Sequence, residues 1–422
     1  MRTEIPAALQ DDPDIATMDA ILRKCVHCGF CLSSCPTYAV TSDERQGPRG
    51  RIYLLKSLIE DGPGNAPGIQ ASIDSCLSCL ACASACPSGV DYQHFIDLAR
   101  PRLEEAAPRT PMDRLTRSLV AFILPYPRRF TMALALARLA KPFKTLLPAR
   151  LRAMVDLAPN RAMGKILSGD HDFPGGGLGR IGLLTGCAQQ PLRPSINAAT
   201  IRLLNRMRLD VVVRDGAGCC GAVVHHLGRG GESFAAARVA AWDRAGPLDA
   251  IVANAAGCGT HLKDYGVVLR GTKDAGAGAR IAVLARDVCE VIAQYELPPV
   301  TRDDLPRIVY HDACSLLHGQ KQTEAPRTLL RAAGFQTSEA AGKHYCCGSA
   351  GSYNMLQPEM AEELGRRRAA ALEASGAQVI ATGNIGCLEQ LRRFTHLPIV
   401  HTVELLDWAT GGPPPPELAM RS

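Results

Sequence analysis

The chain has 422 residues, and because one hydrophobic core rarely serves that many, we expect roughly two to four domains. Hydrophobic residues make up 46% and charged residues 21%, which is typical of a globular protein and excludes broad disorder. The net charge of +6 counts cysteines as neutral. Thiolates in anionic clusters would cancel much of that charge, so no nucleic-acid partner is indicated.

Seventeen cysteines are the unusual feature of the composition. The first residues, Met1 to Asp14, are polar and lack the apolar core of a secretory signal, and no apolar run is long enough for a transmembrane helix. We therefore expect a cytoplasmic protein with reduced thiols, in which clustered cysteines ligate metal. Eight cysteines fall between Cys25 and Cys86, and nine follow from Cys187 onward.

Residues 1–100 contain one cysteine motif twice. The two copies are Cys25-x2-Cys28-x2-Cys31-x3-Cys35-Pro36 and Cys76-x2-Cys79-x2-Cys82-x3-Cys86-Pro87. The first three cysteines of such a run surround one [4Fe–4S] cluster, and the fourth usually completes the other cluster. We therefore expect two clusters, the first held by Cys25, Cys28, Cys31 and Cys86 and the second by Cys35, Cys76, Cys79 and Cys82.

The alternative for these eight cysteines is a pair of zinc sites, which typically use two CxxC pairs and need no third closely spaced cysteine. The segment from Gly47 to Leu55 has a helical pattern, which favours a mainly α-helical dicluster domain over a small β-sheet ferredoxin. Arg49 and Arg51 in this segment either tune the cluster potentials or are ordinary surface charges.

Residues 101–178 are predicted to form a basic helical connector, which ends in the glycine-rich segment 174–177. Nine basic residues and no acidic residue lie from Arg114 to Arg152, interleaved with apolar side chains. A basic amphipathic pattern over 114–152 is typical of a helix on an anionic membrane surface, here the inner face of the cell membrane. The alternative is a linker helix that packs on the protein's own core or on a partner.

The remainder contains an internal repeat, predicted as two α/β units over residues 179–300 and 301–412. A strand-like run ends at Cys187 in the first unit and at Cys314 in the second. In each unit 31 residues then separate this cysteine from a Cys-Cys-Gly triplet. The proline-rich tail, 413–422, is predicted to be disordered.

Each triplet is followed by a helical pattern, 232–245 or 358–374, and by another strand, 248–254 or 378–384. The two second strands lead to Cys258 and Cys387. Alternating strands and helices predict parallel sheets, whose strands end at loops that build sites. These are the loops that carry the cysteines.

These motifs together resemble the iron–sulfur subunit family of glycolate oxidase (glycolate dehydrogenase), over about residues 16–410. The stretches that carry the resemblance are 23–31, 47–53, 218–222, 346–351 and 384–387. The resemblance implies a complex in which flavoprotein partners, holding FAD, oxidise glycolate to glyoxylate. This chain would carry the electrons toward a quinone or another acceptor. Related subunits serve lactate and anaerobic glycerol-3-phosphate dehydrogenases and heterodisulfide reductase.

The chain departs from heterodisulfide reductase, whose repeats end in CxxC, because His261 and Gln390 stand at the final positions. Each repeat keeps four cysteines that are candidates for a further cluster or a redox site. They are Cys187, Cys219, Cys220 and Cys258 in the first, and Cys314, Cys346, Cys347 and Cys387 in the second. The alternative is a pair of structural sites without metal. Cys289 aligns with Val403 and is predicted to be a core residue.

No strand is followed by GxGxxG, so we expect no flavin in this chain and no catalysis by it alone. The favoured interpretation is an electron-transfer subunit of a flavin-dependent 2-hydroxy-acid dehydrogenase. Two alternatives are a catalyst that cleaves disulfides at the Cys-Cys-Gly repeats and a non-redox binder, either a zinc scaffold or a cluster-containing nucleic-acid protein.

Overall fold

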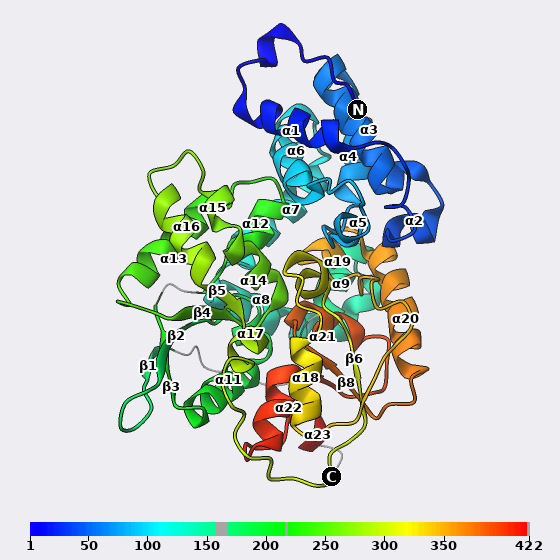
Figure 1. Cartoon of the computed structure of the whole chain (residues 1–422). Coiled ribbons are helices and arrows are strands. Elements are labelled where there is room, and N and C mark those ends of the chain that lie inside the picture. The colour runs from blue at the N-terminus through cyan, green and yellow to red at the C-terminus, as the bar shows by residue number, and fades with distance from the viewer. Residues whose placement is uncertain (157, 159–167, 216–217, 420–422) are drawn as a thin grey trace.

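The computed structural model describes residues 1–156, 158, 168–215 and 218–419 (Figure 1). A small helical domain forms one end of the molecule, and two α/β units lie side by side below it in the view of Figure 1. Among the described residues before Gly169, every regular element is a helix. No helix in the described ranges is long and apolar enough to cross a membrane.

The helical domain is built from six α-helices and three short 3-10 helices. They are η1 (Ala7–Leu9), α1 (Pro13–Lys24), α2 (Pro36–Thr41), η2 (Glu44–Gln46), α3 (Pro48–Asp61), η3 (Pro63–Asn65), α4 (Ala66–Asp74), α5 (Ala81–Ser84) and α6 (Tyr92–Ala106). Helices α1, α2 and α3 each start with proline, which is suited to the first helical position. Asp12 caps α1 by accepting from the backbone N–H groups of Asp14 and Ile15.

The connector is helical as predicted. It contains α7 (Pro111–Ile123), α8 (Pro127–Ala140), the 3-10 helix η4 (Lys141–Leu146) and α9 (Ala149–Asp156). Residues 157 and 159–167 of the predicted connector lie outside the described residues. Strand β1 (Gly169–His171) follows, which the sequence analysis did not predict, and pairs antiparallel with β3 (Leu209–Val213).

Two sheets with the same strand order confirm the internal repeat. The first sheet has the order β1-β3-β2-β4-β5, with β2 (Gly179–Leu184), β4 (Ala250–Ala253) and β5 (Ala285–Asp287). The second has the order β7-β6-β8-β9, with β6 (Ile308–Tyr310), β7 (Thr337–Ser338), β8 (Val379–Thr382) and β9 (Ile399–His401). Apart from β1, all pairs are parallel, as predicted.

Helices surround both sheets. The first unit contains α10 (Gln189–Leu192), α11 (Pro194–Arg206), α12 (Ala222–His226), α13 (Glu232–Asp243), α14 (Ala256–Lys263), α15 (Tyr265–Val268), α16 (Ala275–Leu284) and α17 (Val288–Ile292). The second contains the π-helix η5 (Ser315–Gly319), α18 (Ala325–Ala332), α19 (Tyr353–Leu356), α20 (Pro358–Glu373), α21 (Ile385–Leu391), α22 (Thr402–Ala409) and α23 (Pro416–Ala419).

The two units share one hydrophobic core, which runs from Ile181 and Val211 in the first sheet to Ile308 and Val379 in the second. Across the boundary, His401 Nε2 lies 2.8 Å from the backbone oxygen of Asn254. Cys289 and Val403 are both buried, at the second position of α17 and α22. The core role predicted for Cys289 is therefore confirmed.

The C-terminal tail corrects one prediction. Residues 416–419 form α23, and Glu417 makes an ion pair with Arg193 of the first unit. An ion pair on a single turn of helix holds a segment whose proline content suggested disorder. Residues 420–422 of the predicted tail lie outside the described residues.

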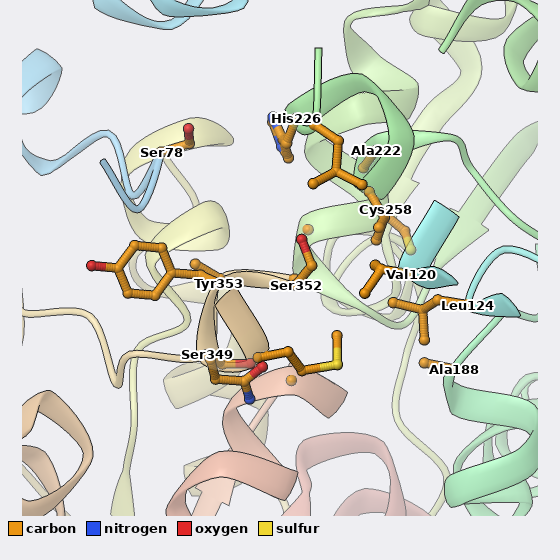
Figure 2. A pocket seen from close by; sticks show the side chains of 18 of the residues that line it. Ser78, Val120, Leu124, Ala188, Ala222, His226, Cys258, Ser349, Ser352 and Tyr353 are labelled. Atoms are coloured by element: carbon orange, nitrogen blue, oxygen red, sulfur yellow. The ribbon is translucent and has the colours of Figure 1, made fainter. Parts of the chain in front are cut away.

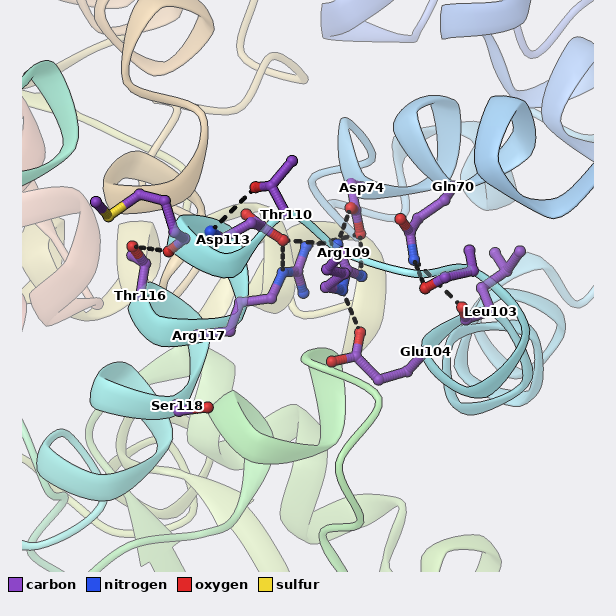
Figure 3. A network of polar contacts seen from close by, with 12 residues as sticks. Gln70, Asp74, Leu103, Glu104, Arg109, Thr110, Asp113, Thr116, Arg117 and Ser118 are labelled. Atoms are coloured by element: carbon purple, nitrogen blue, oxygen red, sulfur yellow. Dashed lines mark hydrogen bonds and ion pairs between the residues drawn. The ribbon is translucent and has the colours of Figure 1, made fainter.

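Arg109 joins the helical domain to the connector (Figure 3). Its guanidinium contacts carboxylates from three segments: Asp74 at 2.7 Å, Glu104 at 2.5 Å and Asp113 at 3.0 Å. Only 8% of the Arg109 side chain is exposed. Removing one partner of a buried ion pair leaves the others charged and poorly solvated, which is far more costly than breaking a surface pair.

We expect Arg109→Met to lower the free energy of unfolding by about 3 kcal/mol, because three acidic groups lose the cation that they share. Arg366→Met is the matched control, since Arg366 is exposed and pairs with Glu362 and Glu363 on its own helix. It should change stability by less than about 0.5 kcal/mol. Denaturant unfolding of anaerobically prepared protein measures both, and equal losses would contradict the structural role of Arg109.

His94 on α6 links the helical domain to the first α/β unit. Its ring nitrogens lie 2.6 Å from Asp91 and 2.8 Å from Asp264. Hydrogen bonds to Asp264 and then Asp91 raise the pKa of His94 from 6.5 to about 10. The ring is therefore a cation at neutral pH and holds two carboxylates together.

The raised pKa predicts a defined pH dependence. The stability that His94 contributes is fully present below about pH 6.5 and is lost as the pH rises through about 10. We expect His94→Gln to lower Tm most near pH 6, with the difference from wild type shrinking toward pH 10. Asp243→Asn, at an exposed ion pair with Arg280, is the control. A His94→Gln effect independent of pH would show that the charge is unimportant.

Candidate metal centre

The two CxxCxxC loops follow the same backbone path. His27 and Ser78, at the third position of each loop, have φ angles of 56° and 50°. Gly29 and Leu80, at the fifth position, have φ angles of 85° and 63°. Because non-glycine residues rarely adopt positive φ, its recurrence at equivalent positions means that both loops are bent in the same way around a centre.

The first loop gathers four thiols as its spacing predicts. Cys25, Cys28 and Cys31 line a small cavity together with Cys86, which comes from the end of the second motif. Cys82 also borders this cavity. Burial and then the neighbouring Cys25 thiol raise the pKa of Cys31 to about 11.

The second loop gathers the complementary set. Cys79 and Cys82 are buried, and burial raises the pKa of both thiols well above its usual value. The neighbouring thiols of Cys76 and Cys35 raise the pKa of each further. Cys35 thus lies near the second loop and Cys86 near the first, the arrangement that the predicted exchange of fourth ligands requires.

These eight thiols fit two [4Fe–4S] clusters. A thiol whose pKa is raised by burial is a poor free thiolate, but a bound cation deprotonates it outright. Iron would therefore supply the positive charge that so many buried sulfur ligands lack. A cluster so held accepts and donates one electron at a time.

Arg51 supplies a fixed positive charge beside the second set. The side chain is 1% exposed and donates to the backbone oxygen of Ser72 at 2.8 Å and to Thr37 Oγ1 at 3.1 Å. Its Nη1 lies 3.9 Å from Cys35 Sγ. Burial alone would lower the pKa of Arg51, but the charges of Cys76 and other neighbours outweigh it and raise that pKa.

Arg49 lies in a different environment. It is paired with Glu44 and donates from Nη1 to the backbone oxygen of His27 at 3.3 Å, beside the first loop. The two arginines of the GPRGR segment therefore face different loops, and Arg51 is the one buried against a candidate ligand.

The cysteines of the repeats converge on a cavity of about 380 Å³ between the helical domain, the connector and both α/β units (Figure 2). Both predicted sets line it: Cys187, Cys219, Cys220 and Cys258, and Cys314, Cys346, Cys347 and Cys387. Strands β2 and β4 of the first unit and β6 and β8 of the second end here, at the carboxyl edge predicted from the α/β pattern. Figure 2 shows Val120 and Leu124 on the side next to Cys258, with Ser352 and Tyr353 across from them.

In the first repeat the four thiols lie close enough to shift one another's pKa. Thiols of Cys187 and Cys220 bond to Cys219 and lower its pKa well below its usual value. The Gly221 N–H also donates to Cys219 Sγ, at 3.4 Å. His261 lies in the same region, and its Nε2 is buried without a hydrogen-bond partner among the described residues.

In the second repeat Cys314 Sγ lies 3.8 Å from Cys346 Sγ, and Asn384 Nδ2 donates to Cys387 Sγ at 3.3 Å. His311 stands beside this set: one of its ring nitrogens and the Sγ atoms of Cys347 and Cys387 all lie within 4.8 Å of one another.

Arg368 fixes the protonation of His311. Arg368 Nε donates to His311 Nδ1 at 3.0 Å, so Nδ1 is the acceptor and the ring proton lies on Nε2. The sequence analysis missed both residues as parts of the site. The available signal was the position of His311 at the end of a strand, three residues before Cys314. Gln390, by contrast, is a structural residue, bonded to Asn354 and Ala361.

The second repeat set adjoins the second cluster loop directly. Cys79 and Cys346 belong to one buried hydrophobic cluster, with Cys314 at its edge. Tyr353 OH donates to the backbone oxygen of Ser75 at 3.1 Å, which ties α19 to the segment just before Cys76. Thiols thus follow one another from the first loop, through the second, into the second α/β unit.

Comparison with known proteins matches this architecture. Residues 21–90 match the family model of a 4Fe-4S dicluster domain, and residues 181–263 and 308–392 each match that of a cysteine-rich domain. The chain is 34% identical to the glycolate oxidase iron-sulfur subunit of Escherichia coli K12, over 97% of this chain and 99% of that protein. It is 30% identical to the probable glycolate oxidase iron-sulfur subunit of Bacillus subtilis, over 88% of each. Lactate utilization protein A of Bacillus licheniformis is 23% identical over 54% of this chain and 99% of that protein.

We expect Arg51→Met to shift the reduction potential of one cluster downward, because a lost positive charge makes the added electron less stable. A hydrogen bond to a charged group contributes about 1.5–3 kcal/mol, which corresponds to roughly 60–130 mV for one electron. Arg45→Met, at an exposed pair with Asp43, should leave both potentials unchanged. Redox titration followed by electron paramagnetic resonance measures the shift, and an upward or absent shift would contradict this role.

Proposed function

Because this chain belongs to the glycolate oxidase iron–sulfur subunit family, we propose that it carries electrons from a flavoprotein that oxidises glycolate to glyoxylate. The observation that carries this proposal is the pair of four-thiol sets in the helical domain, which fit two [4Fe–4S] clusters. The clusters supply one-electron transfer; the chain's residues hold them, exclude water and set their charge environment.

The proposed direction of transfer follows from exposure. Among the eight thiols of the helical domain, Cys28 of the first set is the exposed one. Around it Val26, Phe30 and Tyr53 are large apolar side chains with more than half of their surface exposed, at 67%, 64% and 59%. Apolar and aromatic groups of this kind form the centres of protein interfaces, so electrons from the flavoprotein enter here and leave through the second set.

In the second α/β unit Cys314, Cys346, Cys347 and Cys387 continue the path, since Cys79 and Cys346 belong to one buried hydrophobic cluster. One ring nitrogen of His311 lies within 4.8 Å of the Sγ atoms of Cys347 and Cys387, which adds a polar group to this set. This chain therefore needs no catalytic residue for glycolate itself, and the organic chemistry belongs to the flavoprotein.

The test is the effect of Cys31→Ala on the complex purified with its flavoprotein subunits. Iron should fall from about eight to about four atoms per chain, on the basis of two [4Fe–4S] clusters, and glycolate-dependent reduction of ferricyanide through the clusters should be lost. A dye that accepts directly from flavin should still be reduced. Cys289→Ala, at a core cysteine, is the control and should keep both the iron and the activity.

Two outcomes would contradict the proposal. One is unchanged electron transfer from a Cys31→Ala complex that has lost half of its iron. The other is glycolate-dependent dye reduction by the isolated chain, without flavoprotein. Lactate in place of glycolate is the alternative substrate of the partner, and the same purified complex distinguishes the two by its turnover with each acid.

A further inference from the structure

A group of titratable side chains lies at the boundary between the helical domain and the first α/β unit, outside the two four-thiol sets. We call it the histidine group. Figure 2 shows His226 at the end of the cavity that also carries Ser78 of the second cysteine loop. All members except His225 line that cavity. The members are Asp97 and Arg100 of α6, His225 and His226 of α12, and His261 of α14.

Asp97 is the centre of the histidine group. Only 8% of its side chain is exposed. Its Oδ1 lies 3.5 Å from His226 Nδ1 and 3.6 Å from Arg100 Nη1, and its Oδ2 lies 3.5 Å from His225 Nε2. Burial would raise the pKa of Asp97, but the contacts with His225 and His226 outweigh it and hold that pKa well below its usual value. A fixed negative charge therefore stands between two imidazole rings.

His226 has a hydrogen-bond partner in both of its protonation states. The Nδ1 atom that lies 3.5 Å from Asp97 Oδ1 also lies 3.3 Å from Arg100 Nη1. An unprotonated Nδ1 accepts from the guanidinium, and a protonated Nδ1 donates to the carboxylate. The ring therefore gains or loses a proton without leaving Nδ1 unpaired, as a proton-binding residue inside a protein must.

The three histidines differ in how readily they bind a proton. Burial lowers the pKa of His225, but Asp97 outweighs it, with a contribution from Asp264, and the net shift is upward. Burial and the charge of His225 hold the pKa of His261 well below its usual value, and the two ring centroids are 5.0 Å apart. Burial also lowers the pKa of His226 below 6.5, against the opposing charge of Asp97. His226 is therefore neutral at pH 7, with a carboxylate in place to receive its proton.

Arg100 connects His226 to the second set of cluster ligands. Its Nη2 donates to the backbone oxygen of Cys76 at 3.2 Å, while its Nη1 contacts His226. The His226 side chain is 39% exposed and lines the cavity, so water in the cavity reaches the ring. Reduction of the second cluster adds a negative charge near this neutral imidazole, and a nearby negative charge favours the protonated form of histidine.

We propose that His226 takes up one proton from water when the second cluster gains an electron, and returns it to water when the electron leaves. The electron comes from the reduced flavin of the partner, or from an added reductant such as dithionite. The proton binds Nδ1, whose hydrogen-bond partner then changes from Arg100 to Asp97. Each electron thus travels with a compensating positive charge. This inference rests on the proposed function, because it needs the second cluster, and adds a proton to the transfer.

The experiment measures the reduction potentials of both clusters in the whole complex from about pH 5.5 to about pH 8.5, by redox titration with electron paramagnetic resonance. The signal whose potential Arg51→Met moves is that of the second cluster. One proton taken up per electron lowers a potential by about 59 mV for each tenfold fall in proton activity. We expect wild type to approach this slope from a point below pH 6.5 upward, and to lose it at high pH, where His226 stays unprotonated in both redox states.

Three variants assign the proton. His226→Gln should make the potential of the second cluster independent of pH, because glutamine does not titrate. Asp97→Asn should move the sloping range about one to three pH units lower, the effect of losing a nearby opposite charge. His171→Gln, on the edge strand β1 of the first sheet, is the matched control and should keep the wild-type slope. Infrared spectra of the electrochemically reduced minus the oxidised complex should show a protonated imidazole gained in wild type and in His171→Gln, and not in His226→Gln.

Wild-type potentials that stay constant across this pH range would overturn the inference, and this result needs no variant to fold. A slope that His226→Gln retains would also overturn it, since another group would then bind the proton. Iron content and glycolate-dependent ferricyanide reduction separate this failure from that of the proposed function. With about eight iron atoms per chain and normal activity, the electron-transfer function stands and the proton uptake is wrong, whereas a complex without iron contradicts both.

Discussion

The structure depends on the cost of placing many sulfur ligands close together away from water. Burial disfavours the thiolate form, and neighbouring thiolates disfavour it further, as the raised pKa of Cys31 and Cys79 shows. Metal ions reverse this penalty because they supply positive charge at the centre of each set. The folded state of the helical domain and its cofactors are therefore linked, since metal affinity contributes directly to folding.

The surrounding protein positions charged side chains around the sulfur sites. Arg51 is buried, yet its charge is satisfied by the backbone oxygen of Ser72, by Thr37 and by sulfur. In the second α/β unit Arg368 acts on the sulfur site through His311. It donates to one ring nitrogen of His311, so the ring proton lies on the other nitrogen. Both arginines act on the sulfur sites through geometry that burial keeps rigid.

The connector explains why three compact parts work as one molecule. Its ion pairs at Arg109 hold the helical domain, its inner apolar face closes the cavity, and its outer face remains apolar and cationic. The two α/β units share a core across their boundary, so the two repeat sets keep a fixed relation to that cavity. Electron carriers benefit from such rigidity because each transfer requires the same short separation between centres.

The sequence by itself determined the two cysteine motifs, the repeat with its parallel strands, and the core role of Cys289, and it predicts the exchange of Cys35 and Cys86 between the clusters. These features depend on the spacing of residues along the chain, which can be read directly from the amino-acid sequence. Only the tertiary structure decided that Cys79 and Cys346 share one hydrophobic cluster, that His311 lies near Cys347 and Cys387, that β1 joins the first sheet, and that Arg193 pairs with Glu417 of the tail. Such contacts form between residues far apart in the chain, and the packing of whole elements, which no local pattern encodes, brings them together.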